Sequence, residues 1–110
     1  MKKWELSEDI RTDAELATRV GSIRPLVDEV LGTSAPLVAA RWSVVPASDG
    51  RRSLAFNLSD WTCPGGVEAR FGPDELALDF ETRWKIHRLW GDLLQARNHR
   101  QLAELLKAEA

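Results

Sequence analysis

Residues 79–96 read DFETRWKIHRLWGDLLQA, and this stretch decides how the chain folds. At 100° per residue, its apolar side chains and His87 cover an arc of about 220°, whereas a helix lying on one sheet needs an apolar stripe of only about 100°. The pattern therefore predicts a long helix that buries two of its sides. The arc consists of Phe80, Trp84, Ile86, His87, Leu89, Trp90, Leu93 and Leu94.

Two explanations account for the second apolar side. The sheet can cover one side and a neighbouring helix of the same chain the other, which is the explanation we favour and which makes His87 a hydrogen-bonded core histidine. Alternatively, the part of the arc around Trp84 or Trp90 meets another protein chain. Downstream, residues 98–101 predict the start of a separate last helix that carries Leu102, Leu105 and Leu106.

An earlier helix is expected over residues 13–31. Residues 12–15 (TDAE) match a capping box, and apolar residues follow at spacings of 4, 3, 4 and 3 up to Val30. Pro25 interrupts this stripe, because its ring presses on the carbonyl of Gly21 and removes one hydrogen bond. Either the helix kinks there, or it restarts with Ser22 as a new cap. The unbroken spacing favours a kinked but continuous helix, which Gly32 ends.

Strand patterns occupy much of the remaining sequence. Residues 37–45 are nearly all apolar, whereas residues 52–59 and 67–71 alternate between apolar and polar. A hairpin loop is expected at 46–50, a turn at 64–66 and a helix start at 72–75. Residues 3–6 fit a short additional strand, with Trp4 and Leu6 on one face.

The predicted fold class is α+β, with an antiparallel three- to four-stranded meander and helices packed on one face. The element order is β-α-β-β-β-α-α, and residues 1–110 form a single small domain, as the length of 110 residues favours. The expected core consists of Trp42, Phe56, Leu58, Phe71, Trp84, Trp90 and Leu93.

Composition indicates a globular protein, with 44% hydrophobic and 29% charged residues and a net charge of −2. Cys63 is the single cysteine, so no intramolecular disulfide is possible, which suits a reducing compartment. The N-terminal residues do not resemble a signal peptide, and no apolar run approaches the length of a membrane span. We therefore expect a cytoplasmic protein with no membrane partner.

Catalytic, cofactor and metal motifs are not found in the sequence. Cys63 with His87 or His99 is a conceivable thiol–imidazole pair, but no third positioning group is visible. Two histidines and one cysteine lack metal-ligand spacing, and no phosphate-binding or dinucleotide motif is present. We therefore predict no catalytic residue, no cofactor and no metal, and a protein that is not an enzyme. A small enzyme or ligand binder is kept as the second alternative.

The basic segment 83–100 raises the possibility of nucleic-acid binding, because it carries five Lys or Arg residues and one acidic residue. Arginines could contact phosphates while tryptophans stack on bases. However, the tryptophans of this segment lie on the apolar arc, and Lys85 and Arg88 share the polar strip with Glu81 and Asp92. Nucleic-acid binding is therefore the first alternative function.

Protein–protein interaction is the preferred function, in a small module, subunit or adaptor of a larger homo- or hetero-oligomeric complex. It rests on the wide apolar arc, on the five tryptophans and on the absence of catalytic motifs. Trp61 lies in the loop after residues 52–59, where it either covers the edge of the core or anchors an interface. The candidate partner-binding residues are Trp61, Trp84, Trp90, Arg83, Arg88, Arg97 and Arg100.

Overall fold

The structure is a computed structural model that describes residues 3–46, 50, 52–72 and 74–109. A four-stranded mixed sheet forms its centre. The strands are β1 (Lys3–Leu6), β2 (Ala39–Pro46), β3 (Arg52–Ser59) and β4 (Val67–Phe71), and they lie in this order. The strands β2, β3 and β4 form the predicted antiparallel meander. The predicted hairpin loop after Pro46 lies largely outside the described residues.

The first strand corrects the prediction of an all-antiparallel sheet, because β1 pairs with β2 in parallel, from Lys3 opposite Ala39 to Leu6 opposite Trp42. Between these strands the chain passes through α1 (Glu8–Arg11), α2 (Ala14–Ser22), α3 (Arg24–Leu31) and the 3-10 helix η1 (Gly32–Leu37). Such a crossover returns the chain to the end of the sheet at which it began, so the next strand runs parallel to the first.

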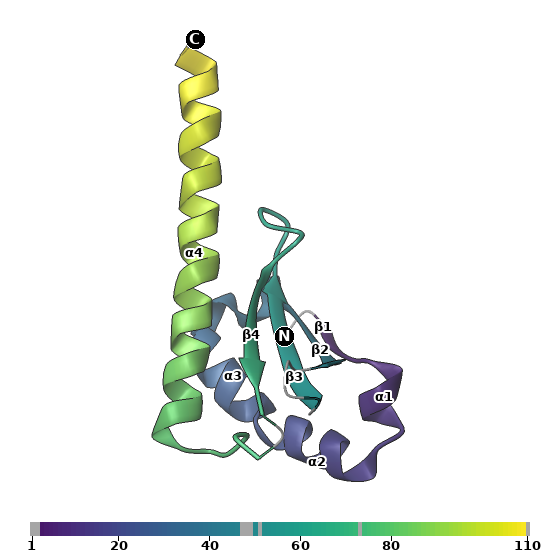
Figure 1. Ribbon diagram of the computed structural model, residues 1–110. Helices are drawn as coiled ribbons and strands as arrows, with labels where there is room; N and C mark the ends of the chain where they lie inside the picture. The colour runs from purple at the N-terminus through teal and green to yellow at the C-terminus, as the bar shows by residue number, and fades with distance from the viewer. Residues whose placement is uncertain (1–2, 47–49, 51, 73, 110) are drawn as a thin grey trace.

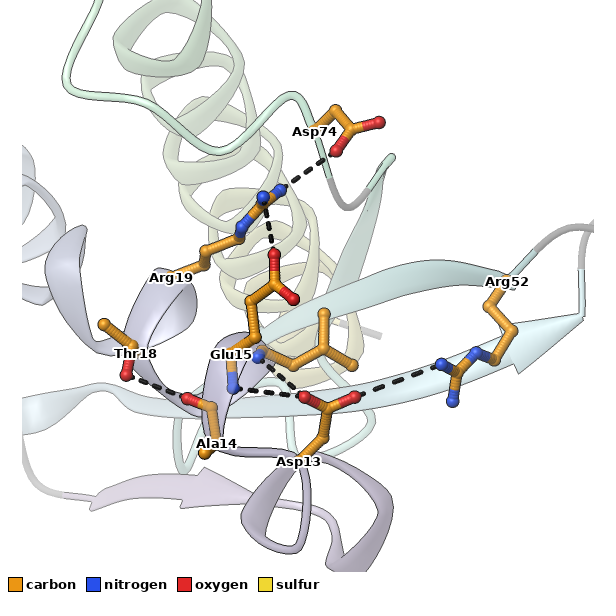
Figure 2. Close-up of polar contacts among 8 residues, drawn as sticks. Asp13, Ala14, Glu15, Thr18, Arg19, Arg52 and Asp74 are labelled. Atoms are coloured by element: carbon orange, nitrogen blue, oxygen red, sulfur yellow. Dashed lines mark hydrogen bonds and ion pairs between the residues drawn. The ribbon is translucent and has the colours of Figure 1, made fainter.

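The helix expected over residues 13–31 is two helices, and the prediction of a continuous kinked helix is wrong. The backbone breaks at Ile23, and Pro25 stands in the first turn of α3, where its missing N–H leaves no helical hydrogen bond unmade. The predicted capping box is also wrong. Asp13 itself caps α2 by accepting hydrogen bonds from the backbone N–H groups of Glu15 and Leu16, both at 3.1 Å (Figure 2).

The last helix, α4 (Phe80–Glu109), is a single helix of 30 residues, so the predicted break near Asn98 is wrong. Residues 98–101 contain neither Gly nor Pro, and the ordinary helix propensities of their side chains let the helix continue. The helix start expected at residues 72–75 is also wrong: residues 74–79 form turns, and α4 begins next to Asp79. Figure 1 shows α4 beside the sheet, with its yellow C-terminal part extending well beyond the rest of the chain.

One apolar core lies between the sheet and the helices. Trp42 on β2 stacks on Phe56 of β3 at a centroid distance of 4.3 Å, and Phe71 of β4 packs against both rings. Ile86, Leu89 and Leu93 bring the first half of α4 into this core. Of the predicted core residues, Trp42, Phe56, Leu58, Phe71 and Leu93 are buried, Trp90 is half-buried and Trp84 is exposed.

Candidate functional site

The start of α4 is fixed to the body of the protein by polar contacts as well as by its apolar residues. Asp79 accepts a hydrogen bond from the backbone N–H of Thr82 at 2.9 Å, and this bond holds the pKa of the Asp79 carboxyl below its usual value. The buried hydroxyl of Thr82 donates to the carbonyl of Glu75 at 3.0 Å. On the flank, Arg83 donates two hydrogen bonds to the Glu29 carboxylate of α3. These contacts determine which side of α4 faces away from the core.

The side of α4 that faces away from the core carries a continuous row of residues, which we call the α4 seam. At 100° per residue it lies about 140° around the helix from the buried Ile86, Leu89 and Leu93. Phe80 is 77% exposed and Trp84 is 52% exposed, and the leucines near the C-terminal end are each more than half exposed. The seam consists of Phe80, Trp84, His87, Gly91, Leu94, Asn98, Leu102 and Leu105, with Leu106 beside it.

The exposure of the seam shows that the sheet and the neighbouring helix do not cover the whole apolar arc. The sheet covers Ile86, Leu89 and Leu93, and α3 lies along one flank of α4, but neither element covers Phe80 or Trp84. The prediction that His87 is a core residue is wrong, because this side chain is exposed on the seam. The single chain therefore leaves apolar surface open on α4.

The loop between β3 and β4 is held against α4 by Asp60, whose side chain is fully buried. One carboxylate oxygen accepts hydrogen bonds from the backbone N–H groups of Thr62 and Cys63, each at 2.9 Å, and from the Thr62 hydroxyl at 2.6 Å. The other oxygen pairs with Arg97 of α4. Arg100, one turn further along, donates to the Thr62 carbonyl at 2.7 Å. We call this set of contacts the Asp60 clasp.

The charge of Asp60 is favoured by its partners despite its burial. Burial by itself raises the pKa of a carboxyl, but the hydrogen bonds from Thr62, Arg97 and the Cys63 N–H outweigh this effect and lower the pKa of Asp60 below its ordinary value. Asp60 is thus an ionised structural residue. The clasp fixes the loop, and Trp61 within this loop is 78% exposed.

The comparisons with known proteins find no relative. No protein family, curated protein or solved structure matches this chain.

The predicted partner-binding residues divide into two groups. Trp61 and Trp84 are exposed as an interface would need, whereas Trp90 is half-buried against the core with the Arg97 guanidinium over its ring. The four predicted arginines all make contacts within the chain: Arg83 pairs with Glu29, Arg97 and Arg100 hold the Asp60 clasp, and Arg88 lies over the ring of Trp84. They point to different sides of α4 rather than to one basic surface.

Sequence reasoning missed Asp60 as a partner of the basic segment and Phe80 as an exposed residue. The sequence Asp-x-Thr-Cys-Pro at residues 60–64 could have predicted the role of Asp60, because it is typical of a turn in which a carboxylate accepts hydrogen bonds from the following backbone N–H groups. The exposure of Phe80 depends on how the start of α3 lies against α4, and the helical periodicity alone does not contain that information.

In the structure, the candidate thiol and imidazole groups lie in different surroundings, and the charged groups at the start of α2 are paired with one another. Among the residues the structure describes, no three His, Cys, Asp or Glu side chains gather as a metal ion would require. Cys63 packs half-buried against the core, whereas His87 is exposed on the seam. A charged cluster at the start of α2 consists of paired groups, with Arg19 bridging Glu15 and Asp74, and Asp13 near Arg52 (Figure 2). Within the described ranges, no helix has both the length and the apolar character needed to cross a bilayer.

Proposed function

We propose that the protein is a non-enzymatic interaction module that binds another protein chain through apolar side chains displayed on α4 and on the Trp61 loop. The observation that carries the proposal is the exposure of Phe80, Trp84 and the seam leucines on one side of a helix whose opposite side is anchored in the core. Large exposed apolar side chains gathered along one side of an element mark interaction sites in proteins. We place this module in the cytoplasm, since Cys63 is a free thiol.

The geometry suits a docking role because two exposed aromatic residues, Trp61 and Trp84, are held in place by the rest of the fold. Aromatic anchors bind best when the free protein already holds them in place, since less conformational entropy is lost on association. The Asp60 clasp fixes the loop that carries Trp61, and the buried first half of α4 fixes Trp84. Nucleic-acid binding is not favoured, because contacts within the chain already engage the arginines that it would need.

Position-specific photo-crosslinking tests the proposal. A photoreactive amino acid is placed at Leu102, at Trp61 or, as a control, at Arg41 on the open polar face of the sheet. After irradiation in cells of the native host, we expect adducts heavier than the 12.4 kDa chain from position 102 or 61, and none from position 41. If all three positions give only the unmodified chain, the proposed function is wrong.

A further inference from the structure

We propose that two copies of this chain form a symmetric dimer in which the α4 seams pack against each other antiparallel. This inference rests on the proposed function and names the partner as a second copy of the chain. The seam residues follow one another at spacings of 4, 3, 4, 3, 4, 4 and 3; up to Asn98 this is the alternation that coiled-coil interfaces use, and beyond it the seam follows the 3.6-residue period of a straight helix. From Phe80 to Leu105 the seam is about 37 Å long.

The seam is complementary to itself when it is reversed. A two-fold axis near residues 92–93 places Phe80 opposite Leu105 of the other copy and Trp84 opposite Leu102. The same axis places His87 opposite Asn98, so the two polar seam residues meet and can form a hydrogen bond. A buried polar pair of this kind fixes the register of paired helices. A two-fold interface requires self-matching of this kind.

Gly91 supports close helix contact at the centre of this arrangement. It lies in the middle of α4, where glycine disfavours the helix compared with alanine. The chain itself does not need the small residue, because a Cβ at this position would have no heavy atom within 4 Å. In the antiparallel register Gly91 faces Leu94 of the other copy, and the missing side chain makes room for the leucine.

The exposed area matches what a stable dimer needs. An aromatic side chain has a full area of roughly 150–250 Å², and a leucine somewhat less. Multiplying these areas by the exposed fractions of Phe80, Trp84 and the three leucines gives roughly 500 Å² of exposed apolar surface per chain. Two chains bury about twice that area. Because apolar atoms make up roughly two thirds of a homodimer interface, the total reaches about 1,500 Å², a standard interface size.

The shape of the molecule favours antiparallel over parallel packing. The body of the protein lies beside the first half of α4, and the second half extends beyond it (Figure 1). A parallel pair would leave Gly91 opposite Gly91 and would leave the large side chains of the seam opposite themselves. An antiparallel pair places the extended part of each helix beside the exposed Phe80 and Trp84 of the other copy. A groove of about 460 Å³ next to Phe80, lined also by Leu26 and Leu78, can then receive Leu105.

Sedimentation equilibrium of the purified full-length chain gives the first test. We expect a mass of twice 12.4 kDa at about 50 µM. Trp84→Glu and Leu102→Lys should each raise the dissociation constant at least about 30-fold, as loss of a central apolar anchor does. The matched control, Leu37→Lys, changes an exposed Leu outside the seam and should leave the mass unchanged. Circular dichroism verifies that every variant is folded.

Mixing the two seam variants tests the register. In an antiparallel dimer of Trp84→Glu with Leu102→Lys, the new glutamate meets the new lysine at one contact, and the native pair remains at the other. The mixture should therefore recover dimer that neither variant forms alone. A native chain that is monomeric at 50 µM overturns the dimer, whereas crosslinks to a different protein at position 102 would still support the proposed function. A native dimer that the seam variants leave intact, or a mixture without recovery, overturns the antiparallel seam.

Discussion

Replacement of Asp60 by Asn is the sharpest test of how the fold is held together. The asparagine carbonyl can still accept the hydrogen bonds from Thr62 and Cys63, but the amide end presents a donor to the Arg97 guanidinium. The variant therefore removes the ion pair while it preserves the size of the side chain. Hydrogen bonds between charged groups contribute about 1.5–3 kcal/mol, and Asp60 is fully buried while Arg97 is 24% exposed. We expect a loss of about 2–3 kcal/mol in the free energy of unfolding.

Urea denaturation at pH 7 measures this loss, and the slope of the transition should be unchanged. In a thermal scan the same loss should lower Tm by roughly 10 °C. Glu68→Gln is the matched control, since it breaks the exposed ion pair with Arg70 and should cost no more than about 0.5 kcal/mol. A double-mutant cycle with Arg97→Met should give a coupling energy above about 1 kcal/mol.

The pH dependence of the same variant follows from the lowered pKa of Asp60. A carboxyl whose pKa is lower in the folded than in the unfolded state stabilises the fold fully above its unfolded pKa, about 4, and loses that contribution as the pH falls through the folded pKa. The gap in stability between the native chain and Asp60→Asn should thus be constant from pH 7 to about 5 and shrink below about 4. A gap under 0.5 kcal/mol at pH 7, or one that widens in acid, would refute the role given to the clasp.

Three other perturbations probe separate parts of the structure. Thr82→Val should lower the free energy of unfolding in urea by about 1 kcal/mol, because the Glu75 carbonyl loses its hydrogen-bond donor. An unchanged urea midpoint would contradict the anchoring of α4 at Thr82. Gly66→Ala should lower the free energy of unfolding by about 2 kcal/mol or more, because φ is +72° and the new Cβ would lie 2.5 Å from the Leu58 carbonyl oxygen. A variant as stable as the native chain would show that the turn adopts another backbone conformation. Hydrogen exchange of the backbone amides of residues 101–109 should be fast in the Trp84→Glu variant and at least about tenfold slower in the native chain at high concentration. The reason is that packing, rather than helix propensity, stabilises an isolated helix end. Equal exchange in both chains would contradict seam packing.

The antiparallel meander could be predicted from the sequence because its signals are local. Alternation in 52–59 and 67–71 places Phe56, Leu58 and Phe71 on one face, and these residues are buried as expected. The parallel partner of β1 could not be predicted in this way. Pairing across residues 7–38 depends on where four short helices (α1, α2, α3 and η1) return the chain, and no local pattern contains that information.

Helix ends were predicted less well than helix faces, for a physical reason. The stripe that includes Leu16, Val20 and Val27 is buried as its spacing indicated, yet it spans two helices. The break at Ile23 leaves the apolar side chains on the same side, so periodicity cannot distinguish a kink from a break. In α4 a predicted break is instead continuous helix, because residues 98–101 resemble a helix cap and yet continue the helix.

The candidate surface follows from the continuity of α4. If the helix had ended near Asn98, the chain beyond it could have folded back to cover Trp84. That segment carries the three leucines Leu102, Leu105 and Leu106. Instead, Arg97 and Arg100 are held by the Asp60 clasp at the place where α4 leaves the body, which fixes the direction of the residues that follow. The basic residues that the sequence offered as possible phosphate ligands therefore set the geometry of the apolar seam. Because the seam leucines lie beyond the body and Trp84 lies beside it, one straight helix keeps them apart, and this separation is the reason for proposing that a second chain covers both.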